Sequence, residues 1–244
     1  MTKRFGATHA QDKSCGTWFS FVKAFTLAEV LITLGIIGVV AAITIPTLVK
    51  NYQKTVWVNQ LKKSVSTLEQ GFQKMLADDG VDDLHNTELG QLFANTSDDG
   101  GYYSDQEEDV MQKANNIFIK YFNTTRFDFN YSNTNQFWCK EHSLLYDKND
   151  KDCVNGDYAS IYLSDGAIIG FASFLSRYDY RNSGCIEIDI NGEKKPNTWG
   201  RDTFAFSVSN NGHLIPRDYE NCNLTENGYS CAAHIIKNGW KMDY

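Results

Sequence analysis

Proline is scarce in this 244-residue chain, at 3 residues, and glycine, at 18 residues, is not enriched. These counts exclude a collagen-like repeat and a proline-rich disordered chain, both of which need far more of these residues. Basic residues are also in deficit, because 23 Lys and Arg face 30 Asp and Glu, which gives a formal net charge of −7. A bulk-basic nucleic-acid-binding protein is therefore not expected, and we expect no nucleic-acid partner.

Motifs that carry chemistry are missing as well. The sequence has no GxSxG, HExxH, Walker A or GxGxxG motif. It has no CxxC pair and no Cys/His spacing typical of a zinc site. The histidines are scattered along the chain, and none pairs with a second ligand at helical spacing. We therefore expect a protein that is not an enzyme and that needs no cofactor.

One long apolar run stands out from this polar background. The mean hydropathy of −0.42 excludes a polytopic membrane protein but leaves room for a single span. Residues 24–49 contain one charged residue, Glu29, and Lys23 and Lys50 bound the run. At about 1.5 Å per residue, a helix over residues 25–45 is roughly 30 Å long, which matches the hydrocarbon core of a bilayer. The run predicts a transmembrane helix.

The distribution of charge predicts how this helix is oriented. Residues 1–24 hold four basic residues and one acidic residue, so the acidic excess lies entirely in the remainder. By the positive-inside rule, the basic start stays in the cytoplasm and the acidic body is exported. A cleaved secretory signal peptide is the alternative, but it has a shorter apolar region and a small-x-small cleavage site. The run here is longer and has no clean site, so we expect it to be retained.

Glu29 is the informative residue in the run. A carboxylate inside a span costs about 2.5–3.5 kcal/mol on insertion scales, so it usually has a partner. If the chain were cut between Ala24 and Phe25, the new ammonium group of Phe25 in a neighbouring copy would be a suitable partner. That pairing would neutralise both charges and set the register between copies. The alternative is a carboxylate that simply reaches the lipid headgroups.

The residues around this position resemble a known family. The sequence KAFTLAEV over residues 23–30 is similar to the prepilin-peptidase site of type IV pilins and type II secretion pseudopilins. Gly38 and Pro46 stand where members of that family commonly carry a Gly and a helix-kinking Pro, and the resemblance covers about residues 23–52. Ala24 departs from the pattern, because the residue before the cut is usually Gly.

The resemblance implies a processing pathway and a function. Residues 1–24 would be a cytoplasmic leader, removed by a prepilin peptidase that methylates the nitrogen of Phe25, and Glu29, Gly38 and Pro46 would serve assembly. The protein would be a structural subunit of a type IV pilus or a type II secretion pseudopilus. The length after the leader favours a minor subunit. Its partners would be other pilin or pseudopilin subunits and an assembly platform in the bacterial inner membrane. The alternative is a membrane-tethered adhesin or ligand-binding head that is not assembled.

The helical pattern continues beyond Pro46. Apolar residues recur at intervals of three and four, which is the spacing of one face of a helix. The pattern predicts one long helix within residues 25–80, kinked at Pro46, that stops at Asp78-Asp79-Gly80. The stripe that we expect to pack on a globular head consists of Val58, Leu61, Val65, Leu68, Phe72 and Met75.

Residues 81–244 have the pattern of a small α+β head. Helical spacing predicts a second helix over residues 105–122. β-rich runs over 157–163 and 167–174, joined by Ser164-Asp165-Gly166, predict a hairpin. Further alternating runs lie at 185–190, 203–208 and 213–215. We expect four or five antiparallel strands packed on the long helix.

Two further features of the head suggest covalent or ionic cross-links. Cysteines fit an exported protein, and five of the six remain if the leader with Cys15 is removed. Proximity in sequence favours the pairs Cys222–Cys231 and Cys139–Cys153, with Cys185 left over. A loop rich in oxygen donors runs from residue 189 to 202, between two expected strands. It offers a possible Ca²⁺ site, although the same residue types also suit a tight turn. The candidate calcium ligands are Asp189, Asn191, Asn197 and Asp202.

Overall fold

A computed structural model describes residues 25–94, 107–130, 158–172, 184–218, 222–224 and 228–244. The chain divides into two compact units, residues 1–48 and residues 49–244. One element, helix α1 (Leu27–Asp79), runs through both units and passes Pro46 without a break. The predicted long helix is therefore confirmed. Its second half belongs to the same compact unit as the head, although the head was expected to begin at residue 81.

The end of α1 follows from its last residues. Gly80 has a φ of +68°, a left-handed conformation that glycine adopts without steric cost. Its N–H donates to the Ala77 carbonyl, and the N–H of Val81 donates to the Leu76 carbonyl. These bonds satisfy carbonyls that the helix itself leaves without partners. The stop predicted at residues 78–80 is confirmed.

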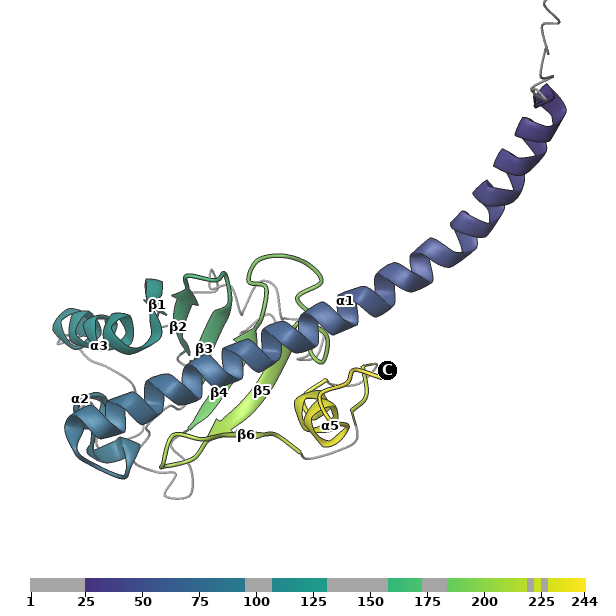
Figure 1. Ribbon diagram of the computed structural model, residues 1–244. Coiled ribbons are helices and arrows are strands. Elements are labelled where there is room, and N and C mark those ends of the chain that lie inside the picture. Colours follow the sequence, from purple (N-terminus) through teal and green to yellow (C-terminus); the bar gives the residue numbers. More distant parts are fainter. Residues whose placement is uncertain (1–24, 95–106, 131–157, 173–183, 219–221, 225–227) are drawn as a thin grey trace, which may run out of the picture. The chain divides into compact units, whose positions relative to one another are not determined.

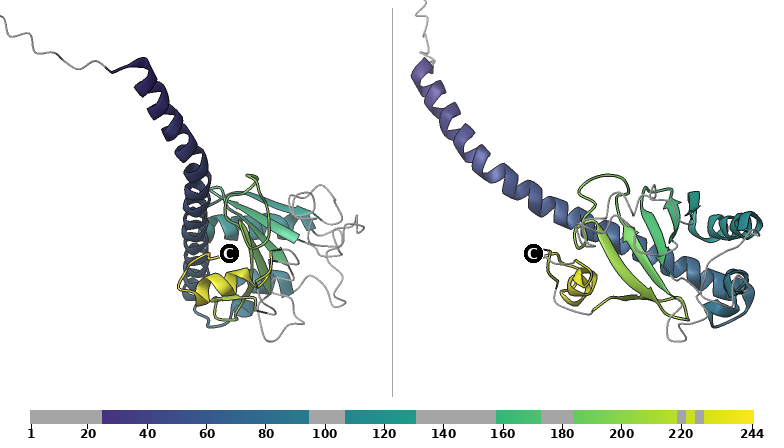
Figure 2. Two further views of the ribbon diagram at one scale, coloured as in Figure 1. Left: turned by 90° about the vertical axis from the view of Figure 1, so that its right-hand side faces the viewer. Right: turned by 180° about the vertical axis from the view of Figure 1, so that it is seen from behind.

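The second unit is built around one antiparallel sheet, which Figures 1 and 2 show lying against the second half of α1. Within the described residues the sheet has six strands, and their order in space is their order in sequence, β1 to β6. Each strand pairs antiparallel with the next one along the chain. The strands are β1 (Thr124–Asn130), β2 (Tyr158–Leu163), β3 (Ile168–Ala172), β4 (Cys185–Asp189), β5 (Thr203–Val208) and β6 (Leu214–Pro216).

The two faces of the sheet differ in chemistry. One face carries the apolar row Phe127, Ile161, Ile169, Ile188 and Phe204, whose members lie opposite one another in the strand register. All six residues of the predicted α1 stripe are buried in the same core as this row, so the predicted packing of the stripe is confirmed. The next row on the opposite face is Ser160, Gly170, Glu187 and Ala205.

Helix α3 (Glu107–Phe122) also packs on the apolar face, and it agrees with the helix expected over 105–122. The Phe118 ring lies 5.1 Å from that of Phe171 and 5.4 Å from that of Phe127, both on strands. The Phe122 ring lies 5.1 Å from that of Phe72 on α1, at an edge-to-face angle. Aromatic contacts therefore join α1, α3 and the sheet.

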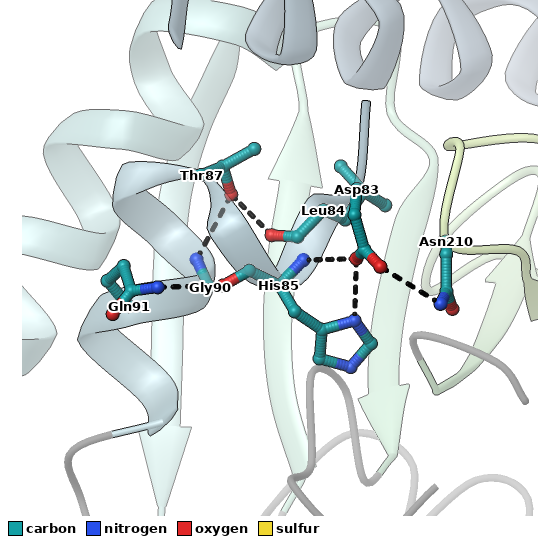
Figure 3. A network of polar contacts seen from close by, with 7 residues as sticks. All are labelled: Asp83, Leu84, His85, Thr87, Gly90, Gln91 and Asn210. Carbon is teal, nitrogen blue, oxygen red and sulfur yellow. Dashed lines mark hydrogen bonds and ion pairs between the residues drawn. The ribbon is translucent and has the colours of Figure 1, made fainter. Parts of the chain in front are cut away.

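A compact polar turn connects α1 to two short helices, η1 (Leu84–Asn86) and α2 (Glu88–Ala94). Asp83 accepts hydrogen bonds from the backbone N–H of His85 (2.9 Å) and from Asn210 (3.1 Å), as Figure 3 shows. Burial acts to raise the pKa of Asp83, but the hydrogen bonds from His85 and Asn210 outweigh it and hold the pKa below its usual value. The turn is thereby tied to the segment between β5 and β6.

Two features of the head differ from expectation. The sheet has six described strands, because β1 follows α3 after a single residue, Asn123, whose φ is +51°. No Gly or Pro separates β1 from the preceding helix. The sequence pattern therefore did not indicate that the helix ends and a strand begins there. The second feature is a short C-terminal helix, α5 (Cys231–Lys237), whose Ala232 and Ile235 join the core.

Candidate functional site

The N-terminal end of α1 is held by a reciprocal pair of side chains. The backbone N–H and the hydroxyl of Thr26 both donate to Oε2 of Glu29, at 2.9 and 2.8 Å. The backbone N–H of Glu29 donates in return to the Thr26 hydroxyl at 3.2 Å. This is a capping box, in which two residues three apart satisfy backbone donors that a helix start leaves unpaired. Thr26 was not singled out in the sequence, although Thr-x-x-Glu before an apolar run is the usual signal.

The capping box leaves one carboxylate oxygen of Glu29 free to accept hydrogen bonds. Among the described residues, the hydrogen bonds of this carboxylate use Oε2 alone. Phe25 lies next to the box with 85% of its surface exposed. Ala24, the other residue of the expected cleavage site, lies outside the described residues. The described geometry leaves Oε1 of Glu29 and the side chain of Phe25 accessible to another molecule.

The apolar part of α1 has no partner within its own unit. Its large side chains are exposed, and none of the most apolar stretch of the helix is buried. The helix has the length and composition needed to cross a membrane. Exposing more than a dozen such side chains to water costs on the order of 20 kcal/mol, which exceeds the usual stability of a whole domain. A lipid or protein surface must therefore cover this helix.

Gly38 and Pro46 both lie on this uncovered helix. A Cβ atom added at Gly38 would meet nothing within 4 Å, so the glycine is not needed for packing inside the described chain. Pro46 has no N–H and cannot donate to the Ala42 carbonyl one turn earlier. Thr44, two residues before it, donates its hydroxyl to the Val40 carbonyl at 2.9 Å. Neither residue is explained by contacts inside the described chain.

The four candidate calcium ligands do lie close together, and hydrogen bonds link them to one another and to the adjacent backbone. Asp202 accepts from the backbone N–H groups of Asn197 (2.9 Å) and Thr198 (2.7 Å) and from the Asn191 side chain (3.1 Å). Asp189 accepts from the backbone N–H of Asn191 at 3.0 Å. These bonds stabilise the turn between β4 and β5.

A calcium site would need more oxygen ligands than these hydrogen bonds leave unused. Ca²⁺ takes six to eight oxygen ligands. Among the described residues, Oδ1 of Asn191 is a buried oxygen without a hydrogen-bond partner, and one such oxygen is too few. No group of three or more His, Cys, Asp or Glu side chains in the described part of the chain is arranged to hold a metal ion. The described hydrogen bonds of this loop thus belong to the turn, and the calcium site stays a prediction.

The cysteines divide into three cases. Cys222 and Cys231 form a disulfide with a Cα–Cα distance of 4.5 Å, so the pairing favoured by sequence proximity is confirmed. It links the start of α5 to the segment before it. Cys139 and Cys153, the other expected pair, lie outside the described residues. Cys185 is a free thiol at the start of β4, and the Arg217 guanidinium donates to its sulfur.

A buried carboxyl group on the polar face of the sheet was not predicted. Glu187 lies at the centre of β4 and is 8% exposed. Burial raises its pKa to about 7, although the positive charge of Arg217 acts in the opposite direction. Its cross-strand neighbours, Gly170 and Ala205, are small and leave room for its side chain. The alternating pattern CIEIDI assigned Glu187 to the polar face, but it gave no sign that this face is covered.

We compared the chain with known proteins. No protein-family model, curated protein or solved structure matches this chain. The described fold is an α+β arrangement of a long N-terminal helix and a small antiparallel sheet.

Proposed function

We propose that this chain is a prepilin-type structural subunit, exported across the bacterial inner membrane and assembled through its N-terminal helix into a type IV pilus or a type II secretion pseudopilus. The observation that carries the proposal is the contrast between the two units. The head has a complete core, whereas the apolar half of α1 has no buried stretch at all. A helix of this kind is stable in a membrane as a monomer and in a bundle of identical helices as a filament.

The residues at the start of α1 support a specific contact between subunits. Cleavage after Ala24 would create an ammonium group on Phe25, beside the capping box. In a neighbouring subunit, Oε1 of Glu29 is left free by that box and would accept from this ammonium group. The capping bonds to Oε2 fix the direction of the carboxylate, so the pairing would set the axial step between subunits. Pro46 and Gly38 lie on the exposed part of α1 and would serve helix packing in the filament.

Processing is tested by the mass of the protein extracted from membranes. The proposal predicts the loss of residues 1–24 and the gain of one methyl group on Phe25. A matched variant, Ala24→Gly, should be processed at least as completely, because it restores the residue usual in the family. An intact leader in both proteins would contradict the proposal and favour a tethered adhesin or ligand-binding head.

The role of Glu29 in assembly requires a control for its role as a cap. Glu29→Ala removes both the free oxygen and the capping box, whereas Thr26→Ala removes most of the capping bonds and keeps the carboxylate. We expect both variants to insert in the membrane, and we expect Glu29→Ala alone to lose at least tenfold in the amount of subunit in sheared filament fractions. Equal losses in the two variants would show that the cap is what matters and would remove the intersubunit role of Glu29.

A further inference from the structure

A groove lies between the head portion of α1 and the C-terminal segment of the chain, entirely within the second unit. It has a volume of about 450 Å³, which is within the range of small-molecule sites. Val58 and Met242 are buried residues of its lining. The other residues that line it are Asn51, Lys54, Thr55, Asn59, Trp240, Lys241 and Asp243.

The charge of the groove is positive although the chain is acidic. Neither Lys54 nor Lys241 forms an ion pair with any described residue. The one acidic residue of the lining, Asp243, is already engaged, because its carboxylate lies 2.7 Å from Nε2 of His234 and accepts from Asn238 at 3.1 Å. The hydrogen bonds from His234 and Asn238 lower the pKa of Asp243 and keep the carboxylate in that contact. Two ammonium groups are thus left to attract an anion.

The surroundings of the groove are those of a membrane–water interface. Lys54 follows the apolar run of α1 by less than three turns of the same helix, and Lys50 lies one turn before it. Tyr52 is 71% exposed between them. Trp240 lies in the groove, with the ammonium group of Lys62 5.4 Å from its ring centre. Lysines and amphipathic aromatic rings are enriched at the headgroup level of membranes.

From these observations we infer that the groove binds the phosphate-bearing headgroup of an anionic phospholipid. Lys54 and Lys241 would pair with the phosphate, while the amides of Asn51 and Asn59 would donate to the polar remainder of the headgroup. The place of Lys54 just beyond the apolar run favours a lipid over a second copy of the chain, because every membrane-inserted monomer has lipid headgroups at that level. The inference rests on membrane insertion and does not require filament assembly.

The experiment uses the full chain purified in a neutral detergent and titrated with short-chain phosphatidylglycerol, with bound lipid counted by native mass spectrometry. The test variant is Lys54→Gln/Lys241→Gln. The control is Lys113→Gln/Lys194→Gln, which removes the same charge from exposed lysines outside the groove. We expect the test variant to bind phosphatidylglycerol about tenfold more weakly and the control to bind like the original chain. Thermal melting of both variants should match the original chain, because all four lysines are solvent-accessible.

Four results would overturn the inference. Equal binding by the test and control variants would show that the groove is not the site. Equal binding of phosphatidylcholine would show that the anionic headgroup is not recognised, and equally tight binding of inorganic phosphate would identify a small-anion site. A loss of self-association in the test variant without a change in lipid binding would identify a second copy of the chain as the occupant. Because filament formation is not measured, none of these results depends on the proposed assembly.

Discussion

Glu187 is a carboxyl group that ionises with difficulty in the folded chain. Its pKa in the fold is about 7 because burial penalises the charged form, whereas in the unfolded chain it is near 4.5. Between these values the folded state holds a proton that the unfolded state has lost, so the free energy of unfolding falls as the pH rises from about 4.5 to 7. Above pH 7 the residue is an ionised carboxylate in a buried position. The positive charge of Arg217 offsets part of the cost of burying this negative charge.

We predict that Glu187→Gln removes this pH dependence. The variant should be more stable than the original chain at pH 8, by roughly 1–3 kcal/mol, and should lose that advantage at pH 4.5, where the original residue is protonated. Chemical denaturation at a series of pH values measures the difference. Glu193→Gln, at an exposed position in the next loop, serves as the control. A difference between the original chain and Glu187→Gln that stays constant with pH would contradict the prediction.

Single residues were predictable from the sequence where local pattern decides their role. The Cys222–Cys231 pair follows from proximity. Glu29 stands out as the one charge in an apolar run, but its capping bonds with Thr26 were not predicted, and its role between subunits stays a prediction. The opposite holds for Glu187. Whether a carboxylate is buried or ionised depends on strands and loops that are distant in sequence, such as the segment that carries Arg217. No spacing rule contains that information.

Among the elements, α1 and α3 approach each other closely at one residue, Gly71. An ideal Cβ added to Gly71 of α1 would lie 2.3 Å from Cε1 of Phe122, the last residue of α3. Real Cβ atoms do not approach an aromatic carbon so closely, so the Phe122 ring fits because residue 71 has no side chain. The position of this glycine inside an otherwise regular helix is therefore explained by packing, which outweighs its low helix propensity.

We predict that Gly71→Ala destabilises the head by about 1–3 kcal/mol, because Phe122 must leave its place against Phe72. The control is Gly38→Ala in the same helix, where an added Cβ meets nothing within 4 Å and the better helix propensity of Ala is free to act. Thermal unfolding in detergent, followed by near-ultraviolet circular dichroism of the aromatic residues, measures both. Equal melting temperatures for Gly71→Ala and the original chain would show that the ring moves without cost.

The elements that the sequence predicted well are those with a long regular pattern. The α1 stripe repeats over five intervals, and the alternation in β4 and β5 is regular, so these elements were located correctly. β1 was missed because TTRFDFN directly follows a helix with no Gly or Pro between them, and α2 and α5 were missed because each helix has only seven residues. Short elements gain their stability from contacts with the rest of the fold, and a local pattern does not show those contacts.

At the scale of the whole molecule, the two units should differ in the solvent they need. The second unit has its own core, disulfide and sheet, whereas the first exposes its apolar side chains. We predict that a chain starting at Val49 is soluble without detergent and unfolds cooperatively. Its melting temperature should lie within a few degrees of that of the head in the full-length protein. Sedimentation and circular dichroism measure solubility and melting. Aggregation of the shortened chain, or a non-cooperative melt, would show that the head needs residues 25–48 to fold.

The strand order has a consequence for how the molecule is made. Because each described strand pairs with the described strand before it in the chain, none of these six has to wait for a later segment before its hydrogen bonds to the preceding strand form. A polypeptide that emerges from a translocation channel from its amino end to its carboxyl end would therefore build the sheet one strand at a time, in the order of synthesis. For a head that is exported as we propose, the rate of folding beyond the membrane would then follow the rate of delivery, with little opportunity for strands to pair in another order.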